Sequence, residues 1–123
     1  MANVKTSFHD GKRIVEIDFD GCKPGAYAPV VEQAMKIISA GPAGSVLAMT
    51  RFDNVRFDPG TVLEMQRFAS AAQPYLKANA LVGITGLKKI VFGGIKPLYR
   101  TPVELFDDPA AARDWLAARG RDG

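Results

Sequence analysis

Two short apolar runs constrain the fold of this chain more than any other feature. Residues 45–52 read Ser-Val-Leu-Ala-Met-Thr-Arg-Phe, with apolar side chains at consecutive positions in the first half, and residues 80–84 read Ala-Leu-Val-Gly-Ile. Consecutive apolar positions are typical of a strand that is covered on both faces. The first run therefore predicts a central parallel strand, and the second predicts another buried strand.

The start of the chain predicts an antiparallel hairpin. Two strand candidates, Asn3 to Phe8 and Arg13 to Phe19, flank the dipeptide Asp10-Gly11. Both residue types of this dipeptide accept the positive φ angles of a tight turn. Apolar and polar side chains mostly alternate in the second strand, but the apolar Ile14 breaks the alternation and indicates partial burial on both faces.

Helical spacing of apolar residues follows the hairpin and the first apolar run. One helix is expected from Ala26 until Gly41-Pro42, and a longer one from Asp58-Pro59 toward Lys77, with Pro74 near its end. Asp58 provides an N-cap carboxylate, and proline fits the first position of a helix. The buried stripe of the longer helix is predicted to consist of Val62, Met65, Ala69, Ala72 and Leu76.

The remaining elements follow the second apolar run. A helix is expected to begin at Gly86 with Thr85 as its cap, before a short strand over residues 103–106. Asp108-Pro109 repeats the cap signature and predicts a last helix through Ala118, which Gly120 ends.

The last helix contains the single tryptophan of the chain. Its inward face is predicted to consist of Ala112, Trp115 and Leu116. Trp115 is therefore expected to anchor the core, and its replacement by alanine would cost ~3–5 kcal/mol.

The element order β-β-α-β-α-β-α-β-α predicts an α/β fold with a single mixed, mostly parallel sheet and right-handed crossovers. A length of 123 residues suits one domain that spans residues 1–123. The excess of 16 basic over 13 acidic residues is too small to indicate nucleic-acid binding. No apolar run approaches the ~18 residues of a membrane span, and the single cysteine, Cys22, forms no internal disulfide, so a cytoplasmic location is expected.

Two stretches carry a resemblance to a known family. Residues 80–90 read Ala-Leu-Val-Gly-Ile-Thr-Gly-Leu-Lys-Lys-Ile, and residues 103–116 read Val-Glu-Leu-Phe-Asp-Asp-Pro-Ala-Ala-Ala-Arg-Asp-Trp-Leu. With the element order, they make nearly the whole chain resemble the SpoIIAA-like group of small bacterial proteins, which is related to STAS and CRAL-TRIO domains. The resemblance implies a small cytoplasmic domain, and classical STAS domains act as regulators that bind partner proteins.

Classical members of the STAS group that antagonise anti-sigma factors are switched by phosphorylation of a serine at the start of the helix after the central strand. The corresponding stretch here, residues 53–61, reads Asp-Asn-Val-Arg-Phe-Asp-Pro-Gly-Thr. Pro59 stands where the resemblance implies a serine, and Thr61 is the nearby hydroxyl. We therefore expect that this chain does not work as a serine phosphoswitch.

Several polar residues are expected at the carboxyl ends of the parallel strands, where open α/β sheets bind ligands. They are Asp53, Asp58, Thr61, Thr85 and Lys88. Helix N-termini at this edge present free N–H groups that bind an anion or a phosphorylated side chain. The alternative interpretation is that Asp58 and Thr85 only cap their helices.

The sequence contains no set of residues with the spacing of a catalytic motif, and it predicts neither a cofactor nor a metal site. His9 stands beside a predicted surface turn without a sequence neighbour that would orient it. Cys22 follows a strand in a loop and would be reactive only where a positive environment lowered its pKa.

Residues 65–103 contain no acidic residue but contain six basic ones. On the helix expected after Thr85, the residues Lys88, Phe92, Lys96 and Tyr99 fall together beside the buried stripe. This flank is interpreted either as a solvated face or as a contact surface for an acidic protein, a second copy of the chain or an anionic lipid surface.

The leading functional hypothesis is a non-catalytic regulatory or interaction domain that binds a protein partner, or itself, through the helices after Asp58 and Thr85. The second hypothesis is a small carrier or sensor of an apolar or amphipathic ligand, which the relation to CRAL-TRIO domains implies. An enzyme that uses Asp53 or Asp58 is the third.

Overall fold

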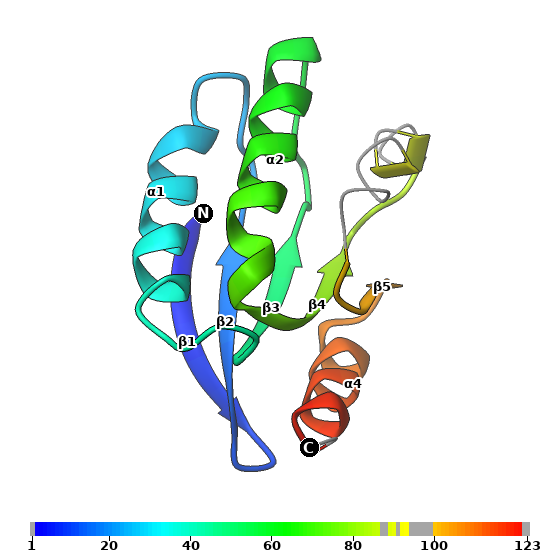
Figure 1. Ribbon diagram of the computed structural model, residues 1–123. Coiled ribbons are helices and arrows are strands. Elements are labelled where there is room, and N and C mark those ends of the chain that lie inside the picture. The colour runs from blue at the N-terminus through cyan, green and yellow to red at the C-terminus, as the bar shows by residue number, and fades with distance from the viewer. Residues whose placement is uncertain (1, 87–88, 91, 94–99, 122–123) are drawn as a thin grey trace.

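The computed structural model describes residues 2–86, 89–90, 92–93 and 100–121 of the chain. Its elements, labelled in Figure 1, are β1 (Asn3–His9), β2 (Lys12–Asp18), α1 (Tyr27–Ile38), β3 (Val46–Arg51), α2 (Pro59–Ala72), β4 (Leu76–Val82), β5 (Val103–Phe106) and α4 (Pro109–Arg121). The strands form one five-stranded sheet in the order β1-β2-β3-β4-β5. β1 and β2 are antiparallel and every other neighbouring pair is parallel, which confirms the predicted mixed α/β sheet.

The hairpin forms around the predicted turn. Asp10 and Gly11 have φ angles of 51° and 76°, the left-handed conformation that a two-residue turn of this kind requires. The register pairs His9 with Lys12 directly before and after the turn. Ile14 is buried on one face of β2 and Val15 on the other, so the strand is buried on both faces, as the break in alternation indicated.

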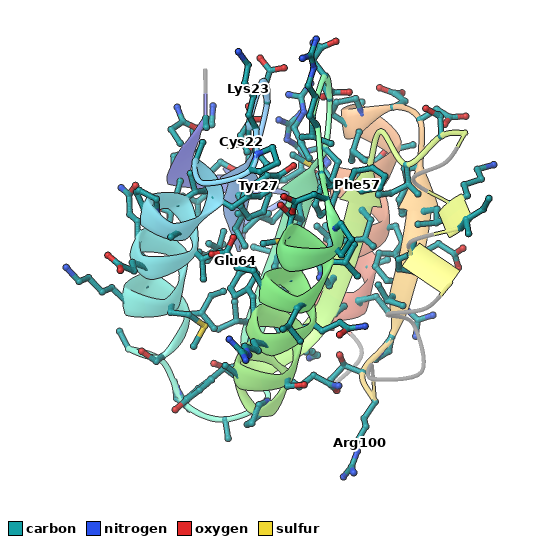
Figure 2. All side chains as sticks on the ribbon, turned by 90° about the horizontal axis from the view of Figure 1, so that it is seen from above. Cys22, Lys23, Tyr27, Phe57, Glu64 and Arg100 are labelled. Carbon is teal, nitrogen blue, oxygen red and sulfur yellow. The ribbon has the colours of Figure 1, made fainter. Side chains whose placement is uncertain are left out.

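The sheet separates two apolar cores. Figures 1 and 2 show α1 and α2 on one face and α4 on the other. The core on the α1 and α2 side includes Val15, Ile17 and Phe19, whereas the core on the α4 side includes Ile14 and Met49. Because the central strands are covered on both faces, consecutive positions of β3 and β4 are buried.

The prediction that α2 continues toward Lys77 is wrong. The helix ends at Ala72, and residues 73–75 form a single 3-10 turn that contains Pro74. Proline has no N–H group to continue the helical hydrogen bonds, so the chain leaves the helix here. Leu76 is buried, but it is the first residue of β4 and not part of the helical stripe, so β4 begins four residues before the predicted Ala80.

The last helix also differs in two respects from its prediction. α4 continues through Gly120 to Arg121. The absence of a side chain at Gly120 lets the helix lie close to β3, since a Cβ atom there would be 3.0 Å from the Leu47 Cδ1 atom. Ala112, Leu116 and Ala117 are the buried residues of α4, whereas Trp115 is half-buried at the edge of the core against Phe106.

The helix predicted after Thr85 lies mostly outside the described residues. Residues 89–90 and 92–93 are helical, and Thr85 is exposed on the loop before them. Within the described parts of the chain, no helix has the length and apolar character needed to cross a membrane.

Candidate functional site

An open pocket lies at the carboxyl ends of the strands, where the sequence placed a ligand site. It is lined by Asp18, Asp20, Arg51, Asp53, Asn54, Gly83, Thr85 and Asp107. Asp53 and Thr85, from the predicted set, therefore lie at one pocket. Four carboxylates and one guanidinium line this pocket, so its charge favours a cationic group over an anion.

The side chains of this pocket are held by one another. The Arg51 guanidinium lies 3.2 Å from the Asp53 carboxylate, and the Asn54 amide donates to Asp20 at 3.0 Å. The hydrogen bond from Asn54 is the main reason why the pKa of Asp20 lies below its ordinary value. Gly83 has a φ of +86°, and a Cβ atom on it would lie 2.7 Å from Asp53 Oδ1, so this position requires glycine.

Asp58 and Thr61 lie at the start of α2 and do not line the pocket of carboxylates. Asp58 Oδ1 accepts hydrogen bonds from the Thr61 backbone N–H and the Thr61 hydroxyl, each at 2.8 Å. These bonds lower the pKa of Asp58. Because Thr61 is buried and its hydroxyl is bonded to the cap, the geometry here is that of a capped helix.

The predicted contact flank is described in part. Lys88, Lys96 and Tyr99 lie outside the described residues, and Lys88 is also the residue that was expected in the anion site. Phe92 is half-buried and lines an apolar cavity between α2 and the sheet. Its ring therefore faces the interior on at least one side.

That cavity is the second feature of the site and has a volume of about 80 Å³. The α2 backbone approaches the strands less closely than the α4 backbone does, which leaves the space between them. The described lining consists of Ile17, Tyr27, Ile38, Ala48, Thr50, Phe52, Val55, Phe57, Thr61, Val62, Met65, Phe68, Ala69, Ala72, Leu76, Asn79, Leu81, Ile84 and Phe92. No charged side chain is among these residues.

The few polar groups of the cavity are deeply buried. The Thr50 hydroxyl donates to Asn79 Oδ1 at 3.1 Å, across β3 and β4. The Tyr27 hydroxyl donates to the Arg56 carbonyl at 2.7 Å, and burial raises the pKa of Tyr27 to about 12. Figure 2 looks onto the end of the molecule where α1 and α2 begin, with Tyr27 and Phe57 labelled there.

A groove runs between α1 and α2 on the outside of the same layer. Its floor includes Val31, Met35 and Phe68, and its rim carries Asp58, Glu64 and Arg67. Leu63 lies on the same helix but does not line this groove, and it is 47% exposed.

His9 has a partner that the sequence did not indicate. Its Nε2 atom lies 2.7 Å from Asp114 Oδ1 of α4 and 3.7 Å from Asp10 Oδ2 of the hairpin turn. The three side chains offer ligand atoms within 4.8 Å of one another. The prediction that nothing orients His9 is therefore wrong, because the fold brings a residue from the far end of the chain beside it.

Glu16 is a second charged residue that sequence reasoning missed. It lies on β2 beneath α4 and accepts hydrogen bonds from the Ser7 hydroxyl at 2.5 Å and from Arg113 Nη2 at 3.1 Å. Burial acts to raise the pKa of Glu16, but these bonds and the charges of Arg113 and Lys5 outweigh it, so the pKa lies below its ordinary value.

Cys22 is buried, and burial together with Asp18 and Asp20 raises the pKa of its thiol. A raised pKa keeps the sulfur protonated at neutral pH, so this environment does not activate Cys22 as a nucleophile.

No family model matches the sequence, and no curated protein matches it. A solved structure is similar in fold: an uncharacterised protein of the DUF3478 family with a SpoIIAA-like fold from Shewanella loihica. The superposition covers 94% of this chain and 95% of that chain with a TM-score of 0.75 and 11% sequence identity. The chain therefore has the SpoIIAA-like fold that the resemblance implied.

Proposed function

We propose that this chain is a cytoplasmic, non-catalytic regulatory domain that acts by binding a protein partner. The observation that carries this proposal is the groove between α1 and α2, which has an apolar floor and a charged rim. Apolar contact area bordered by charged residues is typical of protein interfaces. The partner segment would place apolar side chains on Val31, Met35 and Phe68, with a basic residue opposite Glu64.

Ala71 provides the test of this surface, because it lines the groove and is exposed on α2. Native mass spectrometry of gently purified protein reports partner, ligand and copy number together. We expect a complex of fixed stoichiometry that Ala71→Glu weakens at least tenfold, measured with the identified partner after its own purification.

Phe8 provides the matched control, since it is 74% exposed but lies on the hairpin. Phe8→Glu should leave the complex unchanged. Equal loss in both variants, or no loss with Ala71→Glu, would assign the complex to another surface. A dimer of this chain that responds in the same way to Ala71→Glu would identify the partner as a second copy.

The second candidate function is a sensor or carrier of a small apolar ligand, and the cavity between α2 and the sheet favours it. An apolar pocket with a few convergent polar groups is a usual ligand site of a protein. Since a cavity of about 150 Å³ binds benzene, about 80 Å³ accommodates about three or four non-hydrogen atoms. The ligand, or the part of it that enters, is therefore small.

The two buried alanines of α2 that line the cavity, Ala69 and Ala72, allow this candidate to be tested. Ala69→Leu fills the cavity and should abolish binding of isobutene, an apolar probe of four carbon atoms. Ala71→Leu adds the same side chain at an exposed position of the same helix and should leave isobutene binding unchanged. Absence of binding of every small apolar or amphipathic probe to the original chain would exclude this candidate.

Enzyme activity is the third alternative, and the carboxylates of the strand-end pocket are its test. Activity on a hydrolase and phosphatase panel that disappears with Asp53→Asn would replace the binding proposal with a catalytic one.

A further inference from the structure

Asn79 is an amide on β4 in the apolar cavity between α2 and the sheet. The residue is 5% exposed, and it lines the cavity together with Thr50, which is 4% exposed. A buried carboxamide in an apolar wall is unfavourable unless its donors and acceptor are paired.

Only half of this carboxamide is paired within the described residues. The Thr50 hydroxyl donates to Asn79 Oδ1 at 3.1 Å, and this is the one hydrogen bond of the Asn79 side chain to another described residue. The Nδ2 group carries two N–H donors. Among the described residues, the fully buried side-chain atom without a partner is Thr101 Oγ1, so Asn79 Nδ2 keeps some accessible surface, which the cavity beside it accounts for.

We infer that the cavity binds a small neutral molecule in which a short apolar group carries a carbonyl oxygen, and that Asn79 Nδ2 donates a hydrogen bond to this oxygen. This inference rests on the second candidate function and names its ligand class. The carbonyl oxygen supplies the acceptor that the amide lacks, while the apolar group contacts side chains such as Ile17, Ala69 and Leu81. A carboxylate ligand would lose its hydration without a cationic partner, because no charged side chain is among the described lining residues.

The test uses three probes of four non-hydrogen atoms each: acetone, isobutene and acetate. Their affinities are measured by titration of the methyl signals of the cavity in carbon-13 NMR spectra. Isobutene leaves water more readily than acetone, so the informative quantity is the change in the acetone-to-isobutene affinity ratio between variants.

Asn79→Leu removes the amide with little change in side-chain size. We expect the affinity ratio to shift toward isobutene by about fivefold or more, the value of one hydrogen bond. Val62→Ala alters another lining residue without changing polarity, and it should move both affinities together. Acetate should bind no variant.

The inference is overturned if the ratio is the same in Asn79→Leu and in the original chain, or if acetate competes with acetone. Binding of isobutene with an unchanged ratio would retain the apolar cavity and reject only the role of Asn79. Absence of binding by all probes would reject the second candidate function itself. If Asn79→Leu does not fold, the test is made on the original chain by following the NMR signals of the Asn79 side-chain N–H groups. Acetone must shift these signals and isobutene must not, or the inference is overturned.

Discussion

Breaking the contact between Glu16 and Arg113 should destabilise the chain more than other surface changes on α4. Glu16 is 4% exposed, whereas the Arg113 side chain is 29% exposed and reaches it from α4 at 3.1 Å. Removal of one partner from a buried ion pair costs ~3–5 kcal/mol because the other charge stays buried and unpaired. Water reaches the Arg113 end of this pair, so we expect a loss of about 2–3 kcal/mol for Arg113→Ala.

Urea unfolding at pH 7, followed by circular dichroism, measures this loss. Glu16→Leu combined with Arg113→Leu should recover most of it, because the pair as a whole contributes little against apolar residues of similar size. Arg119→Ala is the matched control, since Arg119 lies on the same helix but its guanidinium stacks on Trp115 at 5.2 Å. We expect less than about 1 kcal/mol for this control.

The same pair determines a pH dependence. The pKa of Glu16 in the folded chain lies below its ordinary value of 4.5. Its contribution to stability is therefore complete above pH 4.5 and is lost as the pH falls through the lower folded-state pKa. The stability difference between the original chain and Arg113→Ala should shrink below pH 4.5, and a difference that stays constant from pH 7 to about pH 3 would refute the reasoning.

Three further substitutions test other contacts by urea unfolding. Gly83→Ala should cost about 2–3 kcal/mol, because the residue has a φ of +86° and its Cβ atom would meet Asp53; an unchanged midpoint would show that the loop relaxes. Trp115→Ala should cost about 2–3 kcal/mol, below the value for a fully buried tryptophan, since the ring is half-buried against Phe106. Tyr27→Phe should cost about 1–2 kcal/mol through the unpaired Arg56 carbonyl, and ultraviolet titration should find the Tyr27 hydroxyl protonated up to about pH 12.

The sequence correctly predicted the hairpin turn and the helix starts, because neighbouring residues form them. Asp10-Gly11 located the hairpin turn, and the proline after Asp58 and after Asp108 located the first residues of α2 and α4. In each case the turn or the cap is formed by residues that are neighbours in the sequence.

The start of β4 could not be predicted in this way. Lys77 and Asn79 interrupt the apolar run, so the sequence pattern placed the strand only after them. In the structure Asn79 bonds to Thr50, and the Lys77 ammonium lies 3.4 Å from the Gly120 carbonyl. Both contacts join residues that are far apart in the sequence, and the spacing of apolar residues alone does not reveal such contacts.

The partners of the charged residues were even harder to predict from the sequence. His9 and Asp114 are 105 positions apart, and Glu16 and Arg113 are 97 apart. Nothing near His9 or Glu16 in the sequence indicates these partners. Asp53 and Asp58 were expected to lie together because both follow the end of the same strand. In the structure Asp53 lines the pocket at the strand ends, whereas Asp58 caps the start of α2 outside that pocket.

The space between α2 and the sheet has a consequence for hydrostatic pressure. A cavity of about 80 Å³ corresponds to about 48 mL per mole, and the decrease in volume on unfolding, usually about 20–100 mL per mole, scales with such internal space. Pressure favours the state of smaller volume, so the side of the sheet that holds the void should loosen before the α4 side, where buried side chains pack directly on β3 and β4. The two faces of one sheet would then differ in compressibility.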